Sequence, residues 1–264
     1  MDKKQYRKIL TEQKESITYI MMNAPETLNA FDEIMLDEML EVIDLCKNDP
    51  SCRVVVIKGH GKGFSAGGDI MGMKHHLETD ISEFFRPVLL RVNQLALAIR
   101  ALPKPVIASV HGAAAGAGFN LALCCDFIVA SKKAKFVQAF VNLGLIPDMG
   151  GTYFLSRALP PSKTMELTML GEVISAESLE ALSIINRLAD DEDLEQETLT
   201  FAKKLAAKPK ESLSTSKSMI NKISYPELTG LLEAEFDYQM YLAKQPDFAE
   251  GIASFIEKRP PKFS

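Results

Sequence analysis

Three stretches of this sequence place small residues and few ionisable side chains where chemistry could occur. The first, 59–69, contains five glycines in eleven residues, and the second, 111–120, is dominated by glycine and alanine. Small residues let a ligand approach the backbone, so that N–H groups can act as hydrogen-bond donors. Because each stretch follows a predicted strand, the two together could hold an oxygen atom that becomes negatively charged during a reaction. They form a candidate oxyanion hole that needs no polar side chain.

Each of these two stretches also has a simpler explanation. Residues 59–69 could form a flexible surface loop, and they match neither the G-x-x-x-x-G-K-[ST] nor the G-x-G-x-x-G phosphate-binding pattern. Residues 111–120 are also typical of a helix that packs closely on a sheet. Taken singly, neither stretch establishes a site.

The third stretch, 143–152, contains one charged side chain, that of Asp148. It is the only acidic or basic residue between Lys135 and Arg157, and it follows Pro147 in an apolar setting. Asp is a frequent helix N-cap, and a helix is expected to begin near Gly150, so capping is one interpretation. The other is a general base whose pKa is raised by burial, as proton abstraction near neutral pH requires. From the residues alone, the cap is favoured.

The elements that would position these stretches alternate between strand and helix. A buried strand, a helix and a second strand are indicated by β-branched runs and by apolar residues at helical spacing. A long helix follows and ends at a Pro-Lys-Pro segment. This order predicts an α/β fold with buried strands. The predicted strands are 16–22, 53–58, 106–110, 126–130 and 135–138, and the predicted helices are 34–47 and 82–102.

The second half of the chain has a helical pattern with almost no strand signal beyond about residue 151. Two final helices, 227–243 and 247–258, carry apolar stripes that need a surface to pack on, which suggests contact between subunits. We divide the chain into a core, 1–200, and a helical oligomerisation region, 201–264.

Composition limits the functional classes. The chain has 264 residues, 47% hydrophobic and 25% charged, as expected for one globular domain or a domain with a small appendage. Its formal net charge of -5 gives no basic field to attract nucleic acid or anionic lipid. The four cysteines form no C-x-x-C pair, so we expect reduced core thiols and no metal site.

Membrane insertion and secretion are not expected. Residues 105–125 carry no charged side chain and are long enough to span a bilayer, but a β-branched run, His111 and a Gly-Ala stretch indicate strand, turn and helix. Residues 1–14 lack an apolar signal core, so we expect a cytoplasmic enzyme with no membrane or nucleic-acid partner.

Taken together, the stretches resemble the crotonase superfamily of enoyl-CoA hydratases and isomerases. Residues 23–30 (NAPETLNA) resemble its N-R-P-x-x-x-N-A motif, with Ala24 in place of the usual Arg, and 63–69 resemble its F-x-A-G-x-D loop. Residues 103–112 are similar to its P-K-P-V…x-G run, and 251–259 to its G-x-x-A-F-x-E-K-R end. The resemblance extends from 16 to 263.

The resemblance implies a crotonase spiral of ββα turns with a C-terminal helical trimerisation region, assembled as a homotrimer or a dimer of trimers. It implies acyl-CoA or acyl-ACP thioester substrates in fatty acid or other lipid metabolism, with coenzyme A as a substrate handle and no separate cofactor. The oxyanion donors fall on the backbone N–H groups of Ala66 and Ala117. Phe255 and Lys258 match positions that hold CoA, in several members across a subunit boundary. The family's substrate- and CoA-binding positions fall on Leu28, Ala30, Ala66, Gly67, Gly68, Asp69, Ile70, Gly116, Asn120, Phe140, Phe255 and Lys258.

The resemblance also bears on the reaction. The two glutamates with which hydratases activate water correspond to Asn120 and Phe140, and neither residue can act as a base. These two side chains are then expected to line the acyl pocket. Residues 134–152 instead resemble two isomerase groups, acting on phenylacetate-pathway CoA thioesters and on decenoyl thioesters of acyl carrier protein, and both imply a catalytic Asp148. We therefore expect this residue to shuttle a proton between two carbons of an acyl thioester, while Ala66 and Ala117 hold the dienolate oxygen.

Two alternatives remain open from the sequence. A hydratase or another crotonase-type reaction could use Asp148 with an ordered water molecule. In a different class, the chain could be a non-catalytic subunit that binds acyl thioesters. A dehalogenase role is disfavoured, because the related aryl-CoA enzymes use a Trp and this chain has none.

Overall fold

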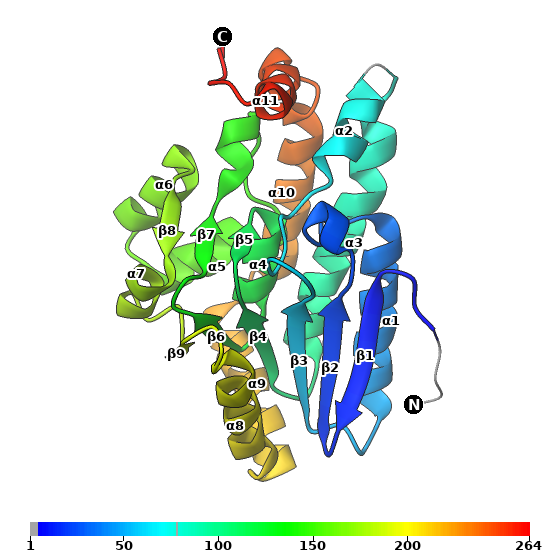
Figure 1. Ribbon diagram of the computed structural model, residues 1–264, viewed down its shortest axis with the longest axis vertical. Helices are drawn as coiled ribbons and strands as arrows, with labels where there is room; N and C mark the ends of the chain where they lie inside the picture. Colours follow the sequence, from blue (N-terminus) through cyan, green and yellow to red (C-terminus); the bar gives the residue numbers. More distant parts are fainter. Residues whose placement is uncertain (1–4, 78) are drawn as a thin grey trace.

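A mixed sheet forms the centre of the computed structural model, which describes residues 5–77 and 79–264. Its six strands lie in the order β1-β2-β3-β4-β6-β9 (Figure 1). β1 pairs antiparallel with β2, and all other neighbours are parallel. The carboxyl ends of β3 and β4 therefore lie at one edge, which brings 59–69 and 111–120 together. The strands are β1 (Ile9–Lys14), β2 (Ile17–Met22), β3 (Val54–Gly59), β4 (Val106–Val110), β6 (Phe127–Ser131) and β9 (Arg187–Ala189).

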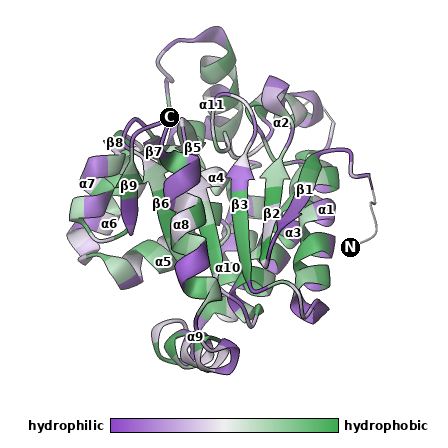
Figure 2. Cartoon of the chain, turned by 60° about the horizontal axis from the view of Figure 1, so that its bottom comes forward, coloured by the Kyte–Doolittle hydropathy of each residue, from purple (hydrophilic) through white to green (hydrophobic). Residues whose placement is uncertain are grey.

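Helices cover both faces of this sheet, as the buried β-branched strands require. On one face, Val55 and Ile57 of β3 share a core with α1 (Glu33–Asn48) and α3 (Ile81–Ala101). On the other, Val54 and Val56 pack in a smaller cluster under α8 (Leu194–Ala206). Figure 2 shows the apolar strands between these helices.

A second, three-stranded sheet stands beyond the carboxyl edge of the first. Its order is β5-β7-β8, and its strands are β5 (Ala113–Ala115), β7 (Lys135–Val137) and β8 (Val173–Ser175). Short helical segments surround it, namely α4 (Ala117–Cys124), η2 (Ala139–Leu143), α5 (Gly151–Ala158), α6 (Pro161–Leu170) and α7 (Ala176–Ala181). A bridge between Ser65 and Ala114 joins the 59–69 loop to β5. The loop is thus an ordered part of this layer and not a loose surface segment.

The C-terminal helices pack on the rest of the chain, two toward the upper end of Figure 1 and one toward the lower end. α10 (Leu228–Leu242) lies along α3, where Asn93 Nδ2 donates to Leu232 O at 2.9 Å. α11 (Pro246–Glu257) contacts η2 and α2 (Ile70–Leu77) at the upper end of Figure 1. One further turn, η1 (Pro25–Thr27), precedes α1.

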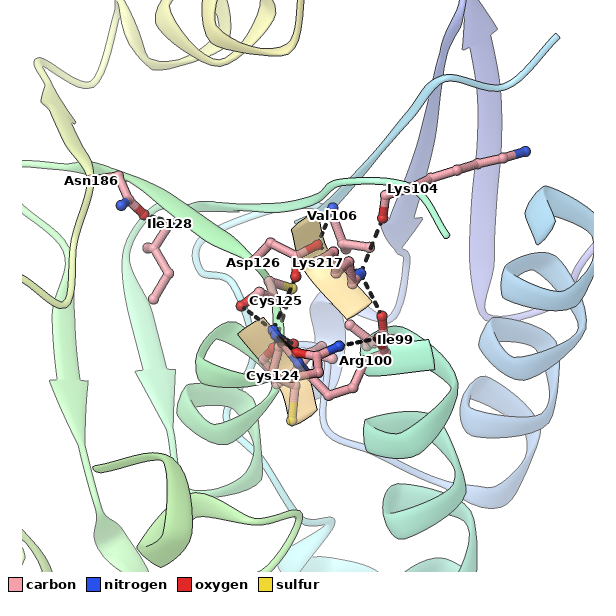
Figure 3. Close-up of polar contacts among 12 residues, drawn as sticks. Ile99, Arg100, Lys104, Val106, Cys124, Cys125, Asp126, Ile128, Asn186 and Lys217 are labelled. Atoms are coloured by element: carbon pink, nitrogen blue, oxygen red, sulfur yellow. Dashed lines mark hydrogen bonds and ion pairs between the residues drawn. The ribbon is translucent and has the colours of Figure 1, made fainter. Parts of the chain in front are cut away.

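An ionic cluster holds α9 (Lys210–Ser224) to the core, as Figure 3 shows. Lys217 Nζ lies 2.7 Å from Asp126 Oδ2, and Arg100 Nη1 lies 3.1 Å from Asp126 Oδ1. Burial lowers the pKa of Lys217, and the Asp126 carboxylate opposes that effect. The outer face of α9 leaves Met219, Ile220 and Ile223 exposed.

The α/β fold with a helical C-terminal region is confirmed, and each predicted helix and strand is present with shifts of one or two residues at its ends. The expected lack of strands beyond 151 was wrong, because β8 and β9 lie there. The predicted boundary at 200/201 falls inside α8, which packs on the sheet. Residues 105–125 divide into β4, β5 and α4, and no helix within the described ranges has the length and hydropathy to cross a membrane.

Candidate active site

Asn29 anchors the 59–69 loop from a turn outside it. Its buried Nδ2 donates to the carbonyls of His60, Gly63 and Phe64 at 2.9 to 3.2 Å, and its Oδ1 accepts from Ala24 N–H at 2.9 Å. Its φ of 56° is a left-handed conformation, which Asn adopts more readily than most residues. The sequence placed Asn29 in the N-R-P-x-x-x-N-A-like motif of residues 23–30 but did not predict this role.

The loop then packs directly against α4. Ser65 Oγ donates to Asn29 O at 2.8 Å and accepts from Gly67 N–H at 3.1 Å. A Cβ on Gly67 would lie 2.5 Å from Ala115 O, and one on Gly118 would lie 2.5 Å from Ser65 O. Glycine is therefore needed for this close approach of the two backbones.

Asp69 ends the loop and opens α2. Its Oδ1 accepts from the N–H groups of Met71 and Gly72, each at 3.1 Å. Asp69 therefore supports the first turn of α2, whose Met73 side chain reaches a cavity beside Asp148.

The two predicted oxyanion donors differ in their present partners. The Ala66 N–H donates to Leu28 O at 2.9 Å. Ala117 begins α4 after Gly116, whose own N–H donates to Val137 O at 2.9 Å. In the part of the chain that the structure describes, the Ala117 N–H has no backbone acceptor. The Ala66 N–H is therefore already bonded in this structure, whereas the Ala117 N–H is not bonded to another backbone group among the described residues.

A narrow cavity with a volume of about 20 Å³ lies between these elements. Three predicted site residues, Gly68, Ala117 and Asp148, line it. The rest of its lining is apolar and comes from the 31–32 turn, α2 and α3: Phe31, Met73, Phe84, Phe85, Val88, Leu89 and Val92. This wall is apolar, but a volume of about 20 Å³ is room for about one water molecule, so a hydrocarbon chain would enter only if side chains of α2 and α3 moved apart.

Asp148 is the one acidic or basic residue, among those the structure describes, that lines this cavity. The residue is 8% exposed, and burial raises its pKa from 3.8 to about 7, although the amides of Asn120 and Gln239 offset part of the rise. The capping interpretation was wrong, because Gly150 is the N-cap of α5. Met149 and Gly150 both have left-handed backbones, with φ of 54° and 79°, between Asp148 and the helix.

Asn120 supports the loop that carries Asp148. It is fully buried, its Nδ2 donates to Asp148 O at 2.8 Å, and its Oδ1 accepts from Gln138 Nε2 at 2.7 Å. Asn120 does not line the small cavity, because its side chain is bonded to the backbone of Asp148, and its expected place in an acyl pocket stays a prediction. Phe140, expected beside it, also lies outside that lining, and its ring packs against Gly116.

The remaining predicted residues do not line this cavity. Ala30 is buried, Leu28 is partly exposed, and Ile70 packs on the core. Phe255 and Lys258 are exposed at the end of α11 and do not line the cavity of their own chain. Within the described residues, no group of three or more His, Cys, Asp or Glu side chains could hold a metal, and the four cysteines are buried and free.

The chain is similar to known proteins over nearly its whole length. The family model described as enoyl-CoA hydratase/isomerase matches residues 12–264. The chain is 34% identical to a trans-2-decenoyl-[acyl-carrier-protein] isomerase of Streptococcus mutans, over 98% of each chain. It is 35% identical to a 1,2-epoxyphenylacetyl-CoA isomerase of Escherichia coli, over 97% of this chain and 98% of the relative.

A solved enoyl-CoA hydratase from Mycobacterium avium subsp. paratuberculosis K-10 superposes with a TM-score of 0.90 at 30% identity, covering 98% of this chain and 100% of the other. Both the sequence match and the superposition cover nearly the whole length. The chain belongs to the enoyl-CoA hydratase/isomerase family, within the crotonase superfamily.

Proposed function

We propose that this enzyme is an isomerase that moves the double bond of an acyl thioester between the 3-enoyl and 2-enoyl positions. The observation that carries the proposal is a single buried carboxyl group, Asp148, in a cavity that Ala117 also lines, and the Ala117 N–H has no backbone acceptor among the described residues. Addition of water by the usual two-glutamate mechanism would need bases at Asn120 and Phe140. The names of the Streptococcus mutans and Escherichia coli relatives support isomerisation.

The chemistry requires one base that acts twice. The Asp148 carboxylate removes a proton from C2 of the 3-enoyl thioester, and the electron pair moves onto the thioester oxygen to give a dienolate. The Ala117 N–H holds that oxygen, and the Ala66 N–H joins it when the bond to Leu28 O is shared or broken. The Asp148 acid then returns its proton to C4, and the double bond forms between C2 and C3. A pKa of about 7 lets the same group accept and donate a proton near neutral pH.

The same site bears on the acyl group, on the thioester handle and on the contact with a neighbouring subunit. The aromatic and aliphatic lining favours a hydrocarbon acyl chain, and CoA or acyl carrier protein would be its thioester handle. Phe255 and Lys258 are exposed, so they could reach the CoA bound by a neighbouring subunit of a trimer or a dimer of trimers. We place the enzyme in cytoplasmic fatty acid metabolism.

The test compares two reactions in two variants. Conversion of a medium-chain 3-enoyl-CoA to the 2-enoyl isomer is measured beside hydration of a 2-enoyl-CoA, for the wild type, Asp148→Asn and the exposed control Asp237→Asn. We expect fast isomerisation and negligible hydration in the wild type and the control, and a loss of at least about 100-fold in Asp148→Asn. Hydration that survives in Asp148→Asn would refute the one-base mechanism. CoA binding without either reaction would favour the non-catalytic binding subunit.

A relative described as a crotonyl-CoA hydratase, from Syntrophomonas wolfei, keeps hydration as the second candidate. It is 32% identical over 98% of each chain. The hydration arm of the assay separates the two functions directly.

A further inference from the structure

A second buried carboxyl group, Glu235, reaches the loop of Asp148 from α10. The residue is 5% exposed, and its Oε2 accepts from the Gly150 N–H at 2.8 Å. Gly150 is two residues after Asp148 and has a left-handed backbone. Among the residues that the structure describes, Oε1 of Glu235 has no hydrogen-bond partner. One helix, far along the chain, therefore fixes the turn that aims the base.

The surroundings of Glu235 hold it without a positive charge. No Lys, Arg or His in the described ranges forms an ion pair with it. Burial, reinforced by the Asp148 carboxyl, raises the pKa of Glu235 to about 8. The side chain is therefore mostly an uncharged acid at neutral pH. The groups beside Glu235 are the Asp148 carboxyl, the N–H groups of Gly150 and Thr152, and the Cys124 thiol of α4. On α3, Asn93 donates to Leu232 O and Arg86 lies over the Phe236 ring, so both contact other residues of α10.

Gln239 strengthens the link between α10 and the site. It lies one turn after Glu235, it is 1% exposed, and its amide faces the Asp148 carboxyl. One face of α10 thus lies beside Asp148 and holds the loop at Gly150 through the 2.8 Å hydrogen bond to Glu235. This bond restrains the turn that follows the base.

We infer that Glu235 is a positioning residue for the proton transfer by Asp148, acting through its hydrogen bond to the Gly150 N–H. The inference rests on the isomerase function proposed above and adds a second group to that site. While Glu235 is uncharged, the forming dienolate meets no second negative charge beside Asp148. When Glu235 ionises at alkaline pH, repulsion between the two carboxylates and the dienolate slows the reaction.

The test uses variants that separate the hydrogen bond from the charge. Glu235→Gln keeps an acceptor oxygen for the Gly150 N–H but cannot ionise, whereas Glu235→Ala removes the acceptor. Glu233→Gln and Glu233→Ala are the matched controls, because Glu233 lies on the same helix and is exposed. For each variant, the isomerisation of a medium-chain 3-enoyl-CoA is followed from about pH 5.5 to about pH 9.5, and both kcat and KM are determined.

We expect Glu235→Ala to lose at least about 30-fold in kcat with little change in KM, since a misplaced base slows chemistry more than binding. Glu235→Gln should recover at least about ten-fold of that loss, and it should lack the wild-type decline above about pH 8. The Glu233 variants should keep the wild-type profile. An alkaline decline that persists in Glu235→Gln, or a fully active Glu235→Ala, would overturn the inference. If Glu235→Ala does not fold, the pH dependence of isomerisation by Glu235→Gln still tests the inference.

A readout without turnover separates this inference from the proposed function. In pH-difference infrared spectra, we expect two protonated-carboxyl bands in the wild type. The band of Asp148 titrates near pH 7 and remains in Glu235→Gln, and a second band titrates near pH 8 and is missing in Glu235→Gln. A wild type that shows the second band but no isomerisation would refute the function while leaving the uncharged Glu235 in place. A wild type that isomerises without the second band would refute the inference alone.

Discussion

At Asp148, the burial that suits catalysis also lowers the stability of the fold. The pKa is 3.8 for the ordinary group and about 7 in the folded chain. Between these pH values the folded chain keeps a proton that the unfolded chain has released. The contribution of Asp148 to the free energy of unfolding therefore falls as the pH rises from about 4 to about 7 and is lowest above that range.

Asp148→Asn should consequently stabilise the protein while removing its activity. We expect the free energy of unfolding to rise by roughly 2 to 4 kcal/mol at pH 8, at ~1.4 kcal/mol per pKa unit, and by much less at pH 4. Urea denaturation at both pH values checks this, with Asp237→Asn as the exposed control. A gain that is equal at pH 4 and pH 8 would show that Asp148 is ionised normally in the folded state.

Of the individual site residues, the sequence could predict only those that lie in recognisable motifs. The spacing within 59–69 and 111–120 and the family resemblance led to Gly68, Ala117 and Asp148, which the structure brings together at the cavity. Glu235 and Gln239 were missed because they lie on an amphipathic helix where a buried Glu has no local signature. The Glu235 bond to Gly150 joins residues 85 positions apart. Only the packing of α10 on α3 creates that contact.

At the scale of the elements, the close contact between the 59–69 loop and α4 is possible because Gly118 has no side chain. A Cβ on Gly118 would lie 2.5 Å from Ser65 O, and neither backbone can move without disturbing the Ala117 N–H next to it. Gly118→Ala should lower the free energy of unfolding by about 1–3 kcal/mol and reduce kcat at least about ten-fold, because overpacking shifts an oxyanion donor.

Gly230→Ala is the matched control for that substitution. Gly230 lies inside α10, and its Cβ would meet open space. Alanine there should raise the free energy of unfolding by about 0.5–1 kcal/mol through helix propensity, with kcat unchanged. Thermal unfolding and steady-state kinetics of both variants check the pair. Equal effects of the two substitutions would show that the close approach at Gly118 does not matter.

The sequence predicted those helices and strands whose residues show a regular hydrophobic spacing or form a β-branched run. Helices α1 and α3 show apolar residues at helical spacing, and β3 and β4 are β-branched runs buried on both faces. β8 and β9 have three residues each, too few for an alternating pattern to emerge. β1 is an edge strand whose residues after Ile9 are mostly exposed and polar, so its pairing with β2, not its composition, makes it a strand.

For the whole molecule, α9 is one of the parts that expose large apolar side chains in a single chain. Lys217, Asp126 and Arg100 hold it by charge (Figure 3), and its apolar residues Met219, Ile220 and Ile223 are more than half exposed. A helix that is held to the core by ion pairs and also exposes apolar side chains is suited to contact another subunit. The trimer or dimer of trimers that the family resemblance implies stays a prediction, and α9 is a surface at which it can be tested.

Ile223→Asp should therefore weaken assembly. Ile223 is 73% exposed, so the substitution costs little in one chain, but a buried carboxylate at a subunit contact is strongly unfavourable. We expect light scattering to give three or six times the chain mass for the wild type and a smaller assembly for Ile223→Asp. Lys222→Asp, a charge change at the neighbouring exposed position, is the control and should keep the wild-type mass if the contact is made by the apolar face. Because Phe255 and Lys258 do not line the cavity of their own chain, loss of assembly should also raise the KM for the CoA thioester. A wild type that scatters as a monomer at the assay concentration and still isomerises would show that the site is complete within one chain.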